Sequence, residues 1–318
     1  MSGETQRRIA IRQLLLCTIL WGVSFPTMKA LALVQQPLLP GTGTWFFTAL
    51  GVMYRFGLAG LIMAILYFRQ LRKLSRLEIE QGIILAMFGG GGILFQMDGL
   101  AYTAASTSAF LTQGYCVFIP LWVALVHRRG PSWKVVLSTT LVVAGVAVLA
   151  KLDFHSLKPG RGELETLIAA LLFTGQILGL EHRRYAANRP DNFSVVMFLG
   201  MALLSVPLVW ANAPGAAACL QAYASVPACG MLAILVVVCT LFAYTLMNRW
   251  QRHVTATEAG LIYCFEPVVA SVMALFLPAI FSSWAGIHYD NEELTLRLLL
   301  GGGLITGANI LLQSKWLK

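Results

Sequence analysis

Apolar runs of about 17 to 25 residues alternate with short polar connectors along the whole chain of 318 residues. A helix rises about 1.5 Å per residue, so each run is long enough to cross the roughly 30 Å hydrocarbon core of a bilayer. The pattern predicts helices over residues 11–32, 45–68, 81–102, 105–126, 133–150, 163–183, 193–212, 226–248, 256–279 and 294–314. We therefore expect an all-α integral membrane protein with ten transmembrane helices.

The composition agrees with a bilayer environment. Apolar residues make up 58% of the chain and charged residues only 12%, whereas soluble domains carry about a quarter charged residues. The formal charge of +9 does not indicate a nucleic-acid partner, because the basic residues lie in short connectors and not on one continuous face. The sequence has no nucleotide-binding P-loop, so it lacks the machinery for ATP-driven pumping by this chain alone.

Lysine and arginine residues predict the orientation, since connectors rich in them stay on the cytoplasmic side. The connectors on the side of the N-terminus hold Arg7, Arg8, Arg12, Arg69, Arg72, Lys73, Arg76, Arg128, Arg129, Lys134, Arg183, Arg184, Arg189, Arg249, Arg252, Lys315 and Lys318. The opposite connectors hold only Lys151, Lys158 and Arg161. This bias requires an even number of crossings, so it favours ten helices and predicts that both termini are cytoplasmic.

Similar segments divide the chain into two halves. The fourth predicted helix contains YCVFIP at 115–120, and the ninth contains YCFEP at 263–267. The fifth and tenth predicted helices share a similar ending, AGV at 144–146 and TGA at 306–308. We expect five-helix repeats over residues 1–155 and 156–318. Because five is odd, the second repeat enters the membrane from the opposite side, as in many secondary transporters.

The order and spacing of several motifs resemble the ten-helix EamA-type members of the drug/metabolite transporter superfamily over nearly the whole chain. These motifs are LWGVSF at 20–25 followed by Lys29, Arg55 in the second helix, Glu266-Pro267 in the ninth, and LGGGLITG at 300–307. The resemblance implies transport of a small metabolite, such as an amino acid, or of a toxic organic compound. It does not identify the substrate.

Among the ionisable residues inside predicted helices, four stand out as candidates: Lys29, Arg55, Asp98 and Glu266. Each costs about 2.5 to 3.5 kcal/mol near the bilayer centre unless a partner, a water-filled cavity or a proton compensates it. Glu266 falls near mid-depth, so it is a candidate proton carrier or counter-ion of a cationic substrate. A fixed ion pair between Glu266 and Arg55 is the structural alternative. Lys29 and Asp98 fall near the outer edge, where we expect both side chains to snorkel to the interface.

Pro120 and Pro267 interrupt corresponding helices of the two repeats and are hinge candidates, because each leaves backbone carbonyls without helical partners. Paired interruptions indicate a central binding site. The candidate residues around this site, in addition to Glu266 and Arg55, are Trp21, Ser24, Gln96, Gln113, Tyr115, Gln176 and Tyr263. Their amides and aromatic rings can bind a polar metabolite, although hydrogen bonding between helices is the alternative for each.

The leading hypothesis is a secondary transporter that works by alternating access, in the export direction and with proton coupling as one mode. An uncoupled facilitator is the first alternative. An intramembrane lipid-processing enzyme is the second, and it would need a nucleophile with a base, or a metal site, at membrane depth. All five histidines fall in connectors or at helix ends, so we expect no enzyme activity, no metal site and no cofactor.

The expected partners are a small-molecule substrate, membrane lipids and, in the coupled mode, protons. Nucleic acid is not expected, and both a monomer and a homodimer remain open. The basic inner connectors fit a bacterial cytoplasmic membrane. Cys219 and Cys229 flank one outer connector, where a disulfide would form if that side is oxidising.

Overall fold

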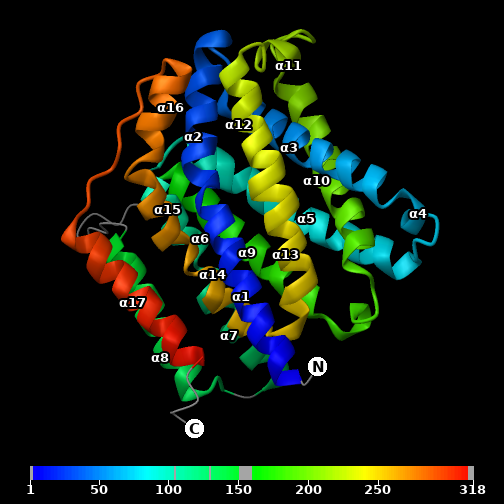
Figure 1. Cartoon of the computed structure of the whole chain (residues 1–318), viewed down its shortest axis with the longest axis vertical. Coiled ribbons are helices and arrows are strands. Elements are labelled where there is room, and N and C mark those ends of the chain that lie inside the picture. The colour runs from blue at the N-terminus through cyan, green and yellow to red at the C-terminus, as the bar shows by residue number, and fades with distance from the viewer. Residues whose placement is uncertain (1–2, 104, 129, 150–159, 314–318) are drawn as a thin grey trace.

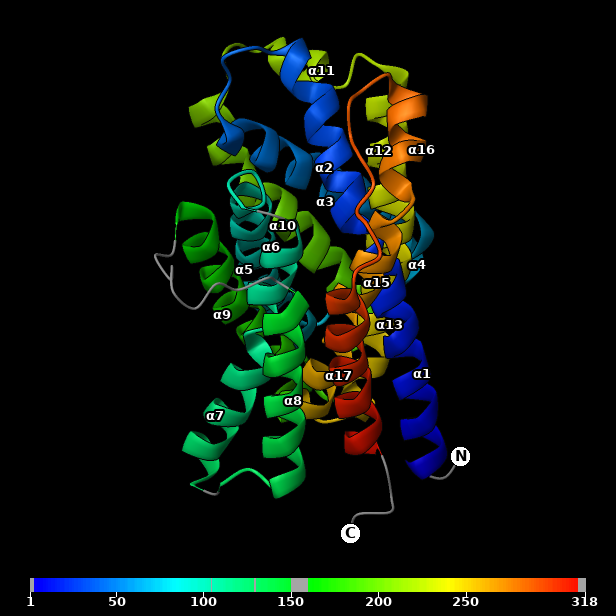
Figure 2. The same ribbon diagram turned by 90° about the vertical axis from the view of Figure 1, so that its left-hand side faces the viewer.

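A computed structural model describes residues 3–103, 105–128, 130–149 and 160–313. All regular secondary structure in these residues is helical. The helices form an elongated bundle (Figures 1 and 2), in which α1 begins and α17 ends at the same end of the molecule. The predicted boundary at residue 155 lies outside the described residues, as do Arg129, Lys151, Lys158, Lys315 and Lys318.

The first predicted helix is longer than the sequence pattern indicated and consists of two parts. α1 (Gly3–Gly22) and α2 (Ser24–Gln35) meet at Val23, and a 3-10 turn, η1 (Gln36–Leu38), follows. At the junction α1 lies against α15 (Glu266–Ala274). A Cβ atom at Gly22 would lie 2.6 Å from Cγ1 of Val269. Only glycine therefore allows this approach between the two helices.

Replacing Gly22 with alanine is expected to destabilise the fold by about 1–3 kcal/mol, because the added methyl group overpacks the contact with Val269 and the backbone of Ala270. Gly303→Ala is the matched control, since a Cβ atom there meets no atom within 4 Å. Unfolding of both purified variants in detergent measures the difference. Equal stability of the two variants would show that the Gly22 contact is not tightly packed in the membrane protein.

Four long helices form the most extensive packing in the bundle. α3 (Thr44–Leu66) is followed by the short α4 (Phe68–Leu71) and by α5 (Arg76–Gly99). α9 (Arg161–Glu181) and α10 (Pro190–Asn212) come from the second half. α10 packs against both α3 and α5, and α5 packs against α9. The core between them contains fully buried phenylalanines such as Phe56 and Phe198.

A second group of helices contains the interrupted segments. α6 (Ala105–Thr112) and α7 (Tyr115–His127) occupy the fourth predicted range, and α14 (Ala256–Tyr263) and α15 occupy the ninth. α16 (Leu277–Ala285) follows α15. α8 (Trp133–Leu149) packs against α17 (Leu296–Gln313) along one side of the bundle (Figure 2).

The eighth predicted helix contains a wide turn. After the short α11 (Ala218–Gln221), α12 (Val226–Val236) leads into a π-helical segment, η3 (Val237–Phe242), and then into α13 (Ala243–Trp250) and a 3-10 turn, η4 (Gln251–His253). Cys229 is not joined to Cys219, and both are free thiols. The Cys229 thiol instead lies 3.2 Å from the carbonyl oxygen of Tyr223.

Seven helical segments among the described residues are long and apolar enough to cross a membrane. They are Glu4–Leu38, Thr44–Leu66, Arg76–Gly99, Arg161–Glu181, Pro190–Asn212, Val226–His253 and Ala256–Ala274. Three shorter apolar helices cover Tyr115–Val126, Trp133–Gly145 and Leu299–Ala308. Large apolar side chains on the outside, such as Ile65 and Leu125, are well exposed, as lipid contact requires. The total of ten crossings stays a prediction.

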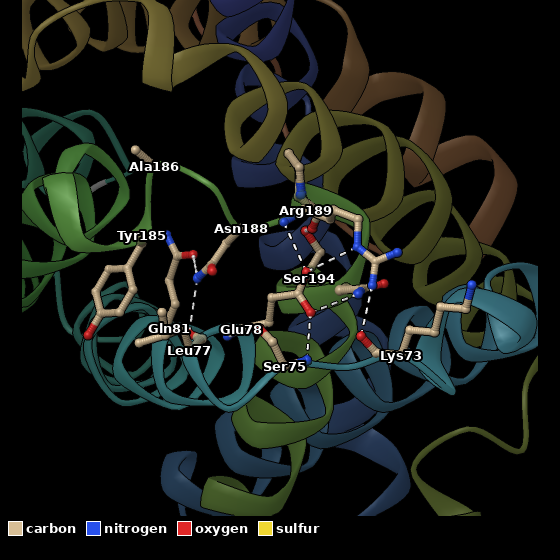
Figure 3. Close-up of polar contacts among 12 residues, drawn as sticks. Lys73, Ser75, Leu77, Glu78, Gln81, Tyr185, Ala186, Asn188, Arg189 and Ser194 are labelled. Carbon is tan, nitrogen blue, oxygen red and sulfur yellow. Dashed lines mark hydrogen bonds and ion pairs between the residues drawn. The ribbon is translucent and has the colours of Figure 1, made fainter.

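Basic connectors far apart in the sequence meet at the start of α5 (Figure 3). Glu78 is buried there and accepts hydrogen bonds from the backbone and side chain of Arg189, from Asn192, and from the backbone of Ser75. Nearby, Asn188 donates to the carbonyl oxygen of Leu77 and to Gln81. These contacts fix the connector between α9 and α10, which includes the turn η2 (Arg183–Tyr185), against α5.

Loss of the Glu78 carboxylate is expected to lower the free energy of unfolding by about 2–4 kcal/mol, because Asn192 and Arg189 would lose their shared acceptor in a buried setting. We expect Glu78→Ala to show this loss in chemical unfolding of the solubilised protein. Glu80→Ala is the control, since the Glu80–Arg184 ion pair is exposed and such pairs contribute less than about 1 kcal/mol. A Glu78→Ala variant as stable as Glu80→Ala would refute the structural role.

Candidate functional site

A partly open cavity with a volume of about 50 Å³ lies where helices of both halves converge. Its walls come from α1, α2, α3, α5, α6, α7, α9, α13, α14 and α15. The lining residues are Trp21, Ser24, Phe25, Met28, Arg55, Ile93, Gln96, Thr112, Tyr115, Phe173, Gln176, Ile177, Tyr244, Met247, Tyr263 and Glu266. Apolar and aromatic walls with a few convergent polar groups are typical of small-molecule sites.

The structure brings together most of the site residues suggested by the sequence. Eight of the nine lie in the wall of this cavity: Trp21, Ser24, Arg55, Gln96, Tyr115, Gln176, Tyr263 and Glu266. Gln113 lies behind the wall, where its Oε1 accepts a 2.6 Å hydrogen bond from the Tyr115 hydroxyl. Its side chain therefore orients a lining residue from outside the cavity.

Arg55 is held by the wide turn of η3. The Nε atom donates to the Thr240 hydroxyl at 2.6 Å, and Nη2 donates to the carbonyl oxygen of Cys239 at 3.1 Å. A π-helical turn leaves carbonyl groups outside the normal helical pattern and often marks a functional site. Nη1 also contacts the Ser24 hydroxyl at 3.3 Å, at the start of α2. The guanidinium is thus fixed at the junction of three helices, with only 2% of the residue exposed.

Glu266 is the first residue of α15, directly after the interruption at Cys264 and Phe265. A helix N-terminus favours a carboxylate, because the first backbone N–H groups carry partial positive charge. The carboxyl group lies near the amide of Gln113 and within electrostatic reach of Arg55. Within the described part of the chain, no ion pair joins it to Arg55, whose hydrogen bonds go to η3 and α2. The two charges therefore face one cavity without direct contact.

Three aromatic rings form one wall. Trp21 lies edge-on to Tyr244 and to Tyr263, with ring centroids 5.3 and 5.4 Å apart. The Tyr263 hydroxyl donates to Gln251 at 2.8 Å, so its polar end is occupied while its ring faces the cavity. The indole N–H of Trp21 is buried and has no acceptor. A bound molecule with an acceptor atom would remove this deficit.

The amides Gln96 and Gln176 take part in contacts between helices. Nε2 of Gln96 donates to the Thr112 hydroxyl at 3.0 Å, which links α5 to α6. Nε2 of Gln176 lies 3.9 Å from the sulfur of Met197, a weak contact that leaves the amide available. Gln96 therefore has a packing role at least in part, whereas Gln176 offers its polar atoms to the cavity.

The two proline hinge candidates occupy different positions relative to the interruptions. Pro267 lies in the first turn of α15, next to Glu266 and directly after the break. Pro120 lies inside α7, whereas the break between α6 and α7 is at Gln113 and Gly114. The missing N–H of Pro267 costs little at a helix start, but Pro120 removes a hydrogen bond inside a helix.

The expectation for Asp98 was wrong. Its side chain does not snorkel to the interface but is completely buried and ion-paired with Arg161. Lys29 lies in the middle of α2, and its Nζ atom is 5.7 Å from the ring centre of Tyr289. Counting residues along a helix gives depth but not the partner that another helix supplies.

Sequence reasoning missed Tyr244 and the two residues of η3 that hold Arg55. Tyr244 and Thr240 are both fully or almost fully buried. They are spaced four residues apart, so both face the same side of the eighth predicted helix. A polar residue and a tyrosine at this spacing in an apolar run were the available signal. Among the described residues, no group of His, Cys, Asp and Glu is arranged to bind a metal ion.

Comparison with known proteins gives a family and a fold. Residues 8–151 match the model of the EamA-like transporter family. No curated protein matches the chain. One solved structure, described only as a crystal structure of a protein, has a TM-score of 0.60 and 16% sequence identity, over 96% of this chain and 98% of that chain. At this identity the likeness concerns the fold. Residues 8–151 are thus similar to the EamA-like transporter family, a member of the drug/metabolite transporter superfamily.

Proposed function

We propose that this protein is a secondary transporter that moves a small polar organic molecule, such as an amino acid or a similar metabolite, through the central cavity by alternating access. The observation that carries the proposal is the unpaired arrangement of Arg55 and Glu266 in one cavity wall. Uncompensated ionisable groups at membrane depth are costly and usually functional. Here they leave a cationic and an anionic contact for a substrate.

The substrate class follows from the groups that remain free in the wall. Glu266 can accept from an ammonium group or bind a proton, and the Trp21 N–H can donate to a carboxylate or carbonyl oxygen. The rings of Trp21, Tyr244 and Tyr263 favour an apolar or aromatic body between these polar ends. A molecule with both an ammonium and a carboxylate group satisfies the cavity best.

Two inverted five-helix repeats explain the helix contacts economically. Under this assignment, three of the five counterpart pairs pack together: α3 against α10, α7 against α14, and α8 against α17. The contact of α5 with α9 has its counterpart in that of α13 with α1. A two-fold axis between the repeats would place each contact of one repeat opposite the equivalent contact of the other. The repeat boundaries 1–155 and 156–318, ten crossings and cytoplasmic termini belong to this proposal.

The basic segments support one orientation of the chain in the membrane. The basic segments predicted to be inside form ion pairs near the start of α5. Arg184 pairs with Glu80, and Arg189 pairs with Glu78. Arg249 pairs with Asp191 in the first turn of α10. This grouping supports one shared cytoplasmic side. We propose export across a bacterial cytoplasmic membrane, driven by inward movement of protons that bind at Glu266.

Uptake into proteoliposomes tests the proposal. The panel contains labelled amino acids, nucleobases and organic cations, each measured with and without a pH gradient, and empty liposomes are the control. A coupled transporter is supported if one class of compound accumulates when the gradient is present and does not accumulate when it is absent. Equilibration that ignores the gradient would support an uncoupled facilitator instead. If no class moves faster than in empty liposomes, the transport proposal for these compounds is wrong.

A further inference from the structure

Three acidic side chains and one arginine gather where α5 ends and α9 begins, away from the lining of the central cavity. Asp98 is the second-last residue of α5, and Arg161, Glu163 and Glu165 lie at the start of α9. The two helices approach closely here, since a Cβ atom at Gly162 would lie 2.7 Å from the carbonyl oxygen of Gly99. Water and lipid are therefore excluded from the contact between the backbones.

A single guanidinium binds two of the carboxyl groups. Arg161 donates from Nη2 to Oδ2 of Asp98 and from Nε, at 2.8 Å, to Oε1 of Glu165. Nε and Nη2 lie on the same edge of the planar guanidinium, so the carboxyl groups that accept from them lie side by side. The ring of Tyr102 stacks on the guanidinium at 4.1 Å, and its hydroxyl accepts from Nη1. Arg161 is thereby fixed over both acids.

The second oxygen of each carboxyl group has no donor in the part of the chain that the structure describes. Oδ1 of Asp98 and Oε2 of Glu165 are both buried without a hydrogen-bond partner. No part of the Asp98 side chain is exposed, and the shared guanidinium places its carboxyl group beside that of Glu165, where a shared proton would make a hydrogen bond between them. Two carboxyl groups can form such a bond only when one of them carries a proton. The proton would satisfy both unpaired oxygens at once.

The charge balance favours the same proton. Asp98 and Glu165 carry two negative charges when ionised, and Arg161 carries one positive charge, which leaves one negative charge in excess. Glu163 accepts from the Thr103 hydroxyl and adds a further negative charge. Among the described residues, the other groups near the pair are neutral: the Tyr102 hydroxyl, bonded to Thr44 on α3, and the hydroxyls of Ser108 on α6 and Thr166 on α9. Within the described residues, Arg161 is the only cation in contact with the pair.

We propose that Asp98 and Glu165 together bind one exchangeable proton. This gives the protein a second proton site, where α5 ends and α9 begins, on the side of the membrane predicted to be outside. The role in transport rests on the proposed function. Solvent can reach the site, because 46% of the Arg161 side chain is exposed. On the same helix, Gln96 lines the central cavity, and Met97 lines a second cavity toward the outer end. Loss of the proton would restore repulsion between α5 and α9, next to both cavities.

Infrared difference spectroscopy of the full-length protein in lipid nanodiscs tests the proton site without any transport. A protonated carboxyl group has a C=O stretching band that a carboxylate lacks. Raising the pH from about 6 to 9 avoids the range in which ordinary carboxyl groups titrate. We expect the native protein to lose such a band over this range. The band should persist in Glu266→Gln and in Glu163→Gln, the matched control on the same turn of α9.

The band should be absent in Glu165→Gln. This variant is expected to fold, because the new amide can accept from Arg161 and donate to Oδ1 of Asp98, as the protonated acid does. Asp98→Asn is the second variant and should lose the same band. A pH-dependent band of native size in both variants would overturn the proposal, and so would its absence from the native protein and from Glu266→Gln.

The transport role has a separate readout. With a solute identified by uptake, Glu165→Gln is expected to reduce the dependence of the rate on outer pH at least threefold, whereas Glu163→Gln should keep it. Unchanged pH dependence in Glu165→Gln would contradict the role in coupling. If the infrared band behaves as expected but no solute moves in any preparation, the proposed function is wrong and the proton site stands.

Discussion

Glu266→Gln is expected to abolish proton-driven accumulation of the transported solute. Glu266 lies at the start of α15 in the cavity wall, without a direct ion pair to Arg55, so its carboxyl group is free to take up and release a proton. Glutamine keeps the size and the hydrogen-bonding capacity but cannot change charge. Exchange of one proton per solute sustains about tenfold accumulation per pH unit, since each 1.4 kcal/mol corresponds to a factor of ten. The variant should fall to equal concentrations on both sides.

The measurement is the steady-state concentration ratio in proteoliposomes under a fixed pH gradient. Glu80→Gln is the matched control, because Glu80 forms an exposed ion pair with Arg184 far from the cavity. This control should accumulate the solute as the native protein does. Gradient-dependent accumulation that survives in Glu266→Gln would remove Glu266 from the coupling step, and the site formed by Asp98 and Glu165 would become the leading candidate.

Arg55→Met is expected to reduce folding stability by about 3 kcal/mol or more and to abolish transport. The side chain is buried and donates to Thr240, to the carbonyl oxygen of Cys239 and to Ser24. Its removal leaves these acceptors unpaired and leaves the Glu266 charge without a nearby cation. Lysine is expected to restore stability only in part, since one ammonium group cannot reproduce the planar contacts with η3.

Thermal and chemical unfolding in detergent measures this effect, with Arg72→Met in the exposed connector as the control. The double variant Arg55→Met with Glu266→Gln is informative, because it removes both charges together. We expect the double variant to lose less free energy of unfolding than the two single variants lose together. The difference measures the electrostatic coupling between the two groups. Strict additivity would show that Arg55 and Glu266 do not interact across the cavity.

The positions of the helices could be predicted because an apolar run long enough to span a bilayer is a strong signal. Helix starts were less accurate. The third predicted range begins at residue 81, whereas α5 begins at Arg76, after a capping box formed by Ser75 and Glu78. The spacing of these two residues was the sequence signal for this start.

The interruptions could not be predicted in detail, since a break in a membrane helix leaves the apolar composition unchanged. The π-helical turn at Cys239 and Thr240 is an example: its backbone geometry depends on Arg55 from another helix. The resemblance to the EamA-type transporters is confirmed over residues 8–151. The substrate roles of the cavity residues stay predictions.

In the described part of the chain, glycines pack closely on α5 and α9 but not at Gly303 and Gly307 of α17. Glycines on α5 and α9 approach their neighbours tightly, as at Gly92 against Phe173 and at Gly175 against Phe88. Gly303 and Gly307 on α17 have no atom within 4 Å of a Cβ position among the described residues. A glycine in the sequence indicates that a close approach is possible, but the neighbour that fills the space comes from the fold.

The accessibility of the central cavity from the two sides of the membrane tests the account most directly. Ser24 lines the cavity and is almost fully buried, so Ser24→Cys places a thiol in it. Membrane-impermeant thiol reagents are applied to right-side-out and to inside-out vesicles, and labelling is compared with that of the native protein, whose Cys229 is already exposed. Alternating access predicts extra labelling from both sides, slowed by the transported solute. Extra labelling from one side only, or from neither, would contradict a cavity that opens to each side in turn.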